Sequence, residues 1–260
     1  MISKNQVKWV RQLELKKNRR REGLFVAEGP KVVGDLLQAG FTAKVLFSTH
    51  EREDAQTVTD DELRRLSFLQ HPQEILGVFH IPEQPESLSP LGNASSTLGN
   101  ASSTLGNAPY ADGLCLALDG VQDPGNLGTI IRIADWFGIK AIYCSPDTAD
   151  AYNPKVVQAT MGSLAHVPVV YCQLTELLAH VRCPIYGTLL DGDNIYRQEL
   201  APQGIIVMGN EGNGISQDVR SLITHRLLIP NFHTAHETAE SLNVAIATAI
   251  TCSEFRRRGI

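Results

Sequence analysis

From residue 114 onward, short apolar segments alternate with amphipathic segments along the chain. Apolar runs bounded by polar or glycine-rich turns are typical of buried strands, and the segments between them have the periodicity of helices. This alternation predicts a mostly parallel sheet covered by helices on both faces. The predicted elements lie at residues 114–119, 127–137, 141–145, 154–165, 167–172, 174–181, 185–190, 204–208, 215–222, 226–230 and 238–256.

The composition is that of a globular protein that can bury a sizeable core. Of the 260 residues, 43% are hydrophobic and 20% are charged. No apolar run approaches the roughly 20 residues needed to span a bilayer, and the N-terminus lacks the apolar centre of a signal peptide. Five cysteines are scattered without a C-x-x-C pair, which favours reduced, buried thiols over disulfides or a metal site. We therefore expect a cytoplasmic protein with no membrane partner and no metal.

The positive charge is concentrated at the N-terminus, although the net charge of the chain is −5. Residues 1–22 hold eight basic side chains against two acidic ones, and three arginines at 256–258 form a second cluster. Localised positive charge can bind phosphates whatever the overall sign of the protein. A solvated basic helix is the alternative interpretation of the N-terminal cluster.

The sequence predicts two domains joined by a linker. Residues 1–81 are expected to form a small αβ domain, because a basic helix precedes further short helix and strand patterns there. Residues 82–110 begin with several prolines and continue with the repeat Leu-Gly-Asn-Ala-Ser-Ser-Thr, a composition typical of flexible linkers. Residues 111–260 form the second domain. The elements expected in the first domain are a strand at 24–28, a helix from Pro30 to Ala39, a strand at 44–48, a helix after the capping box Thr59–Glu62 and a strand at 75–80.

The most informative segment of the second domain is residues 121–138, directly after its first predicted strand. The residues Asp123-Pro-Gly125 strongly favour a turn, and Asn126 can then cap a helix that ends at Gly138. Arg132 falls on the flank away from the apolar stripe of this helix. A strand end beside a helix start is where open α/β sheets bind their ligands. An ordinary turn with a capping asparagine and a solvated arginine would give the same pattern.

Two further strand ends carry polar or glycine-rich residues. The run Met208-Gly-Asn-Glu-Gly212 lets a ligand approach the backbone closely, although its glycine spacing is not that of a dinucleotide fingerprint. Ser241 and Asn243 stand near the start of the last predicted helix, after the strand that ends at Ile229-Pro230. Polar ligands are favoured at a helix N-terminus, but a glycine turn and a serine cap can also be purely structural.

Together these segments resemble the three motifs of the SpoU/TrmH family of RNA ribose 2′-O-methyltransferases. The first motif corresponds to Asn126-x-Gly-x-x-x-Arg132, the second to Met208–Gly212 and the third to Ile229-Pro followed by Ser241-Leu-Asn243. Residues 153–162 look like the helix that lies between the first two motifs in that family. The resemblance covers about residues 112–255, and residues 1–80 resemble, less specifically, the ribosomal-protein-like RNA-binding domain that often precedes it.

The resemblance implies a fold, a cofactor and an assembly. The expected fold is α/β, with the C-terminal part of the chain threaded into a deep trefoil knot, and the expected assembly is a homodimer. S-adenosylmethionine would bind in the knot, with Thr188 and Leu189 flanking its adenine. The other residues expected to bind the cofactor, mainly through backbone groups, are Gly209, Asn210, Gly212, Ile229, Pro230 and Leu242.

The resemblance also implies a catalytic set, with Arg132 presented by the other subunit. An RNA substrate is expected, and the appended N-terminal domain favours rRNA over tRNA. Two other functional classes remain as alternatives: a non-catalytic RNA-binding protein on the same scaffold, and a nucleotide-dependent oxidoreductase. The expected catalytic residues are Asn126, Arg132, Glu211, Ser241 and Asn243.

One departure from the family pattern lies in the third motif. Residues 231–240 form a longer loop without glycine, so the cofactor loop is expected to have a different shape. His233, His236 and Glu237 in this loop have a spacing that could hold a metal, but a solvated loop is the interpretation we prefer.

Overall fold

The computed structural model describes residues 2–83, 112–232 and 241–257. The chain divides into two compact units, of which the first contains Met1–Glu83 together with Asp150–His166 and the second contains Gln84–Ala149 and Val167–Ile260. The repeat at 91–108, the histidine loop 233–240 and Arg258 lie outside the described residues. None of the helices in the described part of the chain is long and apolar enough to cross a membrane.

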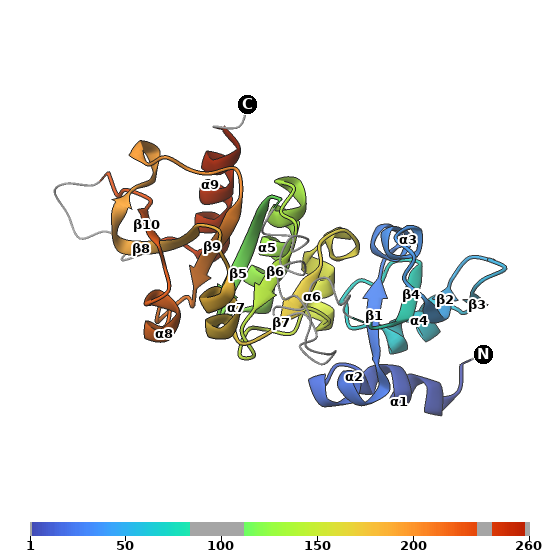
Figure 1. The fold of residues 1–260 in the computed structure, drawn as a ribbon. Coiled ribbons are helices and arrows are strands. Elements are labelled where there is room, and N and C mark those ends of the chain that lie inside the picture. The colour runs from blue at the N-terminus through green and yellow to red at the C-terminus, as the bar shows by residue number, and fades with distance from the viewer. Residues whose placement is uncertain (1, 84–111, 233–240, 258–260) are drawn as a thin grey trace, which may run out of the picture. The chain divides into compact units, whose positions relative to one another are not determined.

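The first unit is built on a four-stranded sheet in the order β1-β4-β2-β3, with β4 antiparallel to both of its neighbours. The capping box predicted at Thr59 and Glu62 is present, and all three strands expected in this region are confirmed. Its elements are α1 (Lys4–Gln12), α2 (Lys16–Glu22), β1 (Leu24–Glu28), α3 (Pro30–Gln38), β2 (Ala43–Ser48), β3 (Gln56–Thr57), α4 (Asp60–Leu66), β4 (Ile75–His80), α6 (Pro154–Ala159) and the 3-10 helix η3 (Ser163–Ala165) (Figure 1).

The single basic helix expected at the N-terminus is in fact two helices, because Arg19 organises the turn between them. Arg19 is 1% exposed, and its guanidinium donates hydrogen bonds to the backbone carbonyls of Leu13 and Glu14. It also forms an ion pair with Asp150, with a distance of 2.5 Å between Nη2 and Oδ2. Arg19 therefore serves the structure of this unit and is not available to bind phosphate, contrary to its inclusion in the predicted basic cluster.

Residues 150–166 complete the first unit from a distant part of the sequence. The Tyr152 ring lies 4.9 Å from that of Phe25, and the Lys31 ammonium donates a hydrogen bond to the Met161 carbonyl. The helix predicted at 154–165 is interrupted because Met161 and Gly162 both have positive φ, so α6 ends before them. This segment is thus part of the unit formed by the N-terminal residues.

The second unit confirms the mostly parallel sheet. Its six strands are all parallel and lie in the order β10-β8-β9-β5-β6-β7. The trefoil knot stays a prediction, because strand order alone does not test it. The elements are β5 (Leu114–Asp119), α5 (Pro124–Trp136), β6 (Ile142–Cys144), β7 (Val169–Tyr171), α7 (Leu174–His180), β8 (Ile185–Asn194), the 3-10 helix η4 (Ile195–Arg197), β9 (Gly204–Gly209), α8 (Gln217–Arg220), β10 (His225–Leu228) and α9 (Val244–Arg257).

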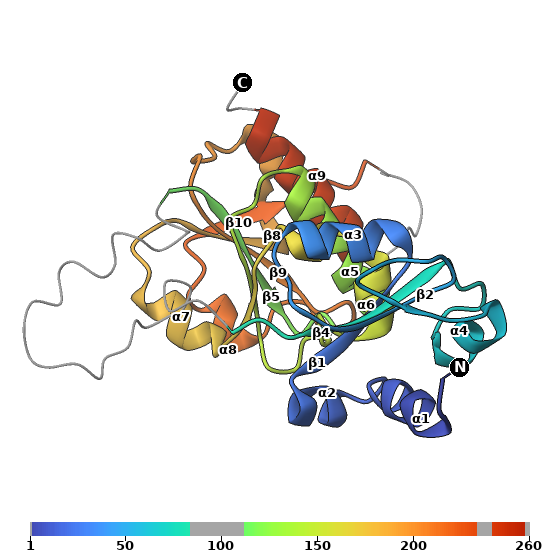
Figure 2. The same cartoon turned by 90° about the vertical axis from the view of Figure 1, so that its right-hand side faces the viewer.

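Helices cover both faces of this sheet, as the alternation of elements predicts. Figure 2 shows α5 and α9 side by side on one face and α7 and α8 together on the other. Strand β5 is buried along its whole length, and Cys115 and Ala117 belong to the core beneath α7 and α8. Since the central strands are parallel, their carboxyl ends meet at one edge, where the loops after β5 and β9 lie close together.

Candidate active site

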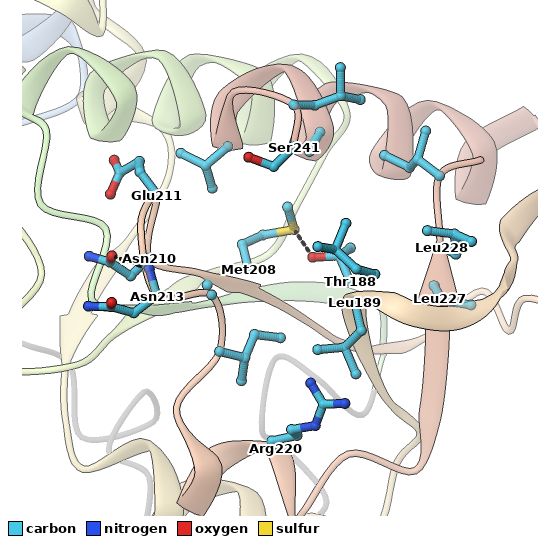
Figure 3. A pocket seen from close by; sticks show the side chains of 18 of the residues that line it. Thr188, Leu189, Met208, Asn210, Glu211, Asn213, Arg220, Leu227, Leu228 and Ser241 are labelled. Carbon is cyan, nitrogen blue, oxygen red and sulfur yellow. Dashed lines mark hydrogen bonds between the residues drawn. The ribbon is translucent and has the colours of Figure 1, made fainter. Parts of the chain in front are cut away.

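A cavity of about 630 Å³ lies at the carboxyl ends of β8, β9 and β10. Its walls combine apolar side chains with a similar share of polar groups (Figure 3). Glu211 and Ser241 lie at one end, whereas Arg220 lies at the other. The lining residues are Thr188–Asp191, Met208–Ile215, Arg220, Leu227–Ile229, Ser241, Leu242, Val244 and Ala247.

A chain of side-chain hydrogen bonds joins residues of all three sequence motifs at one end of this cavity. The Asn126 amide nitrogen donates to Glu211 Oε1 at 2.9 Å. The Asn243 amide nitrogen donates in turn to Asn126 Oδ1, also at 2.9 Å. These three residues are far apart in the sequence, and the sheet brings them together as the motif pattern predicts.

The helix-capping role expected for Asn126 is wrong. Asp123 is the N-cap of α5, and its carboxylate accepts a hydrogen bond from the Asn126 backbone N–H at 2.8 Å. Pro124 occupies the first helical position, which suits a residue that has no N–H to donate. The Asn126 side chain is therefore left for the contacts with Glu211 and Asn243.

Asn243, and not Ser241, caps the last helix. The Asn243 Oδ1 accepts hydrogen bonds from the backbone N–H groups of Ala245 at 2.9 Å and Ile246 at 3.3 Å. The helix predicted to begin at residue 238 accordingly begins at Val244. Ser241 lines the cavity, exposed, on the same side as Glu211 (Figure 3).

Asn210 holds the glycine-rich loop in place. Its Oδ1 accepts hydrogen bonds from the backbone N–H groups of Gly212 and Asn213, and its amide nitrogen donates to the Gly120 carbonyl at 2.7 Å. The buried carboxylate of Asp119 adds a second tie by accepting from the Ser216 N–H at 2.7 Å. The loop after β9 is thus fastened to the loop after β5.

Most of the residues predicted to bind a cofactor line the cavity. Thr188, Leu189, the loop residues 209–212, Ile229 and Leu242 all do so, whereas Pro230 is not among the lining residues. Thr188 points inward, where its hydroxyl lies 3.5 Å from the Met208 sulfur (Figure 3). The predicted cofactor-binding positions therefore lie around one space, although nothing in this geometry tests their roles.

Of the predicted catalytic residues, Glu211 and Ser241 line the cavity, and Asn126 and Asn243 reach it only through their hydrogen bonds with Glu211 and each other, whereas Arg132 has neither kind of placement among the described contacts. It is exposed on α5 and is not one of the lining residues. Trp136 lies about one turn further along α5, and its 86% exposure is high for so large a side chain. The exposed face of α5 therefore presents a cation and an aromatic ring.

Comparison with known proteins identifies the family. The model of the SpoU rRNA methylase family matches residues 113–253, and that of an MRM3-like substrate binding domain matches residues 4–77. A 23S rRNA (guanosine(2553)-2′-O)-methyltransferase of Bacillus subtilis, RlmP, is 31% identical, with 98% of this chain and 97% of that protein covered. The chain belongs to the SpoU rRNA methylase family.

Solved structures of SpoU and TrmH proteins support this assignment. A TrmH-family protein from Porphyromonas gingivalis is 40% identical, covers 99% of both chains and has a TM-score of 0.81. An AdoMet-bound rRNA methyltransferase from Sinorhizobium meliloti is 28% identical, covers 100% of this chain and 97% of its own, and also has a TM-score of 0.81. The likeness extends over both units of this SpoU-family chain.

Sequence reasoning missed the charged cluster at the far end of the cavity. Asp191 forms an ion pair with Arg220 and a second one, at 3.4 Å, with Arg226. The hydrogen bond from Arg220 lowers the pKa of Asp191 below its ordinary value. Asp191 is two residues after the predicted cofactor residue Leu189, but its partners come from other elements, so local sequence gave no signal for the cluster.

The glycine loop provides a matched pair of substitutions. A Cβ at Gly209 would lie 2.3 Å from the Gly214 carbonyl carbon, whereas a Cβ at Gly212 would meet only Asn210 Oδ1 at 3.6 Å. We expect Gly209→Ala to destabilise the protein by about 1–3 kcal/mol, because backbone atoms must move. Gly212→Ala should melt close to wild type in the same thermal unfolding experiment. Equal melting temperatures for the two variants would contradict this packing of the loop.

Proposed function

We propose that this chain transfers a methyl group from S-adenosylmethionine to a ribose 2′-hydroxyl in rRNA. The observation that carries the proposal is the hydrogen-bonded set of Glu211, Asn126 and Asn243 beside a cavity of ligand size. The methyltransferase names of the full-length relatives support it, and the MRM3-like substrate binding domain favours rRNA over tRNA. A cytoplasmic location and a trefoil knot are part of the same proposal.

The cavity fits S-adenosylmethionine in size and in the chemistry of its walls. Cavities of roughly 300–1,000 Å³ are typical of cofactor sites, and this one measures about 630 Å³. Its walls offer both apolar and polar groups, as a cofactor with an adenine ring and a charged amino acid part requires. The cofactor would supply an electrophilic methyl group on a sulfonium. The residues that would hold it are Thr188, Leu189, Gly209, Asn210, Gly212, Ile229 and Leu242, all of which line the cavity.

The protein must then position the ribose hydroxyl and bind the RNA around it. Asn126, Asn243 and Ser241 would orient the hydroxyl and the surrounding loops. A guanidinium has only donors and is protonated at every physiological pH, so Arg132 would clamp a phosphate beside the target ribose. Exposed basic side chains of the first unit, among them Lys4, Lys8 and Arg20, would bind RNA elsewhere.

A homodimer would bring Arg132 to an active site. Arg132 does not line the cavity of its own chain, and its face of α5 carries the exposed Trp136. Helix α9, which packs against α5, leaves Ile246 52% exposed. Large exposed apolar side chains on adjacent helices are typical of a surface that a second copy covers. We infer that each active site receives Arg132 from the partner chain.

The substrate can be identified by mapping ribose methylation in RNA from a strain that lacks this protein. We expect one 2′-O-methylated rRNA position to be lost and to return when that RNA is incubated with purified protein and S-adenosylmethionine. Loss of a tRNA position alone would favour a tRNA methyltransferase. Unchanged methylation throughout would favour a non-catalytic RNA-binding protein.

Subunit mixing tests the shared active site. Arg132→Ala and Asn243→Ala should each lower the rate by about 10²–10³-fold, the usual cost of removing a group that stabilises a transition state, while S-adenosylmethionine affinity stays within a few-fold. If Arg132 acts across the interface, mixing the two variants creates one intact site in each heterodimer and restores activity. Light scattering should give about twice the chain mass of 28.4 kDa. A monomeric wild type, or a mixture that stays inactive after verified subunit exchange, would contradict the shared site.

A further inference from the structure

We propose that Glu211 is the proton acceptor of the methyl transfer, taking the proton that the ribose 2′-hydroxyl loses. The inference rests on the proposed function and assigns one chemical role within it. The geometry reaches this role by elimination among the described residues, because the neighbouring amides cannot take up a proton and the other carboxylate of the cavity is engaged by two arginines.

Three amide oxygens near Glu211 accept hydrogen bonds from other donors. Asn126 Oδ1 accepts from Asn243, and Asn243 Oδ1 accepts from two backbone N–H groups at the start of α9. Asn210 Oδ1 accepts from Gly212 and Asn213. Neutral amides do not take up a proton at physiological pH in any case. These three asparagines can therefore orient groups, but they cannot remove a proton.

Only three titratable side chains are found among the described residues that line the cavity, namely Asp191, Glu211 and Arg220. Asp191 is engaged by Arg220 and Arg226, and the hydrogen bond from Arg220 lowers its pKa. Figure 3 shows Arg220 at the opposite end of the cavity from Glu211. Arginine has no acceptor atom, which excludes both Arg220 and the Arg132 of a partner. Glu211 is the carboxylate that remains.

The hydrogen-bond donors around Glu211 leave its carboxylate able to accept a further hydrogen bond. Asn126 donates to Oε1 at 2.9 Å, and the backbone N–H groups of Asp123 and Gln122 lie at 3.4 Å from Oε1 and Oε2. The Asp123 carboxylate is occupied by the cap of α5. Each Glu211 oxygen has two lone pairs, so Oε2, which accepts only from Gln122 among these donors, keeps acceptor capacity. The Glu211 side chain is exposed at the same end of the cavity as Ser241.

The reaction balances with one proton and one electron pair. The ribose oxygen forms the new bond to the methyl carbon, the carbon–sulfur bond breaks with its electron pair going to sulfur, and the hydroxyl proton passes to Glu211. A hydroxyl is far more acidic once its oxygen begins to bond to carbon. A carboxylate can therefore accept the proton late in the step, when a stronger base is no longer needed.

The test compares wild type, Glu211→Gln and Asp191→Asn in single-turnover assays with saturating S-adenosylmethionine across an acidic pH series. Glutamine can still accept the hydrogen bond from Asn126 but cannot take up a proton. We expect Glu211→Gln to lose about 10²–10⁴-fold in rate, the usual contribution of general acid–base catalysis. Its cofactor affinity by calorimetry should stay within a few-fold. The wild-type rate should fall toward acidic pH, as expected when a carboxylate accepts the proton, and Glu211→Gln should lack this dependence.

The controls separate proton acceptance from positioning. Asp191→Asn removes the other carboxylate of the cavity and should keep the acid dependence. Formate, a small carboxylate, should partly restore the rate of the Glu211→Ala variant. This rescue experiment also tests the proposal if the Glu211→Gln variant does not fold. A Glu211→Gln enzyme that keeps the acid dependence, whatever its rate, would overturn the proposal, as would a Glu211→Ala enzyme that formate does not rescue. If wild type transfers no methyl group, the proposed function itself fails.

Discussion

The side-chain amide of Asn126 lies between Glu211 and Asn243, and the polar end of the cavity depends on these two hydrogen bonds. One partner belongs to the loop after β9 and the other to the start of α9. Both amide orientations are fixed, because Asn126 donates to a carboxylate and Asn243 accepts from backbone N–H groups. The arrangement requires that the Asn126 side chain be free, which follows from the capping of α5 by Asp123.

The parallel sheet explains why residues so distant in sequence can meet. Strands β5 and β9 are neighbours in register, so the loops that follow Asp119 and Gly209 begin side by side. Asn210 then bonds across to Gly120 and fastens the second loop to the first. The same glycine loop that bears Glu211 also forms a wall of the cavity. A ligand in this cavity would therefore lie beside Glu211 and the bonded asparagines.

Much of this arrangement could be predicted from the sequence, because it follows from local patterns. Apolar runs located the strands, and polar residues after three strand ends located the site. What could not be predicted depends on partners far away in the chain. In the sequence Arg19 looks like any other basic side chain of the N-terminal cluster, because its ion-pair partner Asp150 lies far away in the chain. The ion pairs of Asp191 likewise involve arginines from two other elements, α8 and β10. Asn126 is a residue type that often caps helices. Asp123 caps α5 instead, because Pro124 directly after it occupies the first helical position.

A double-mutant cycle on Asn126→Ala and Asn243→Ala tests most directly whether the three motifs form one coupled site. The free energy of unfolding would be measured for wild type, both single variants and the double variant. Side chains in direct contact show interaction energies of about 0.5–3 kcal/mol, and we expect a value in this range. Additivity within about 0.3–0.5 kcal/mol, as for independent sites, would contradict the account, because the hydrogen bond that joins the first and third motifs would then contribute nothing.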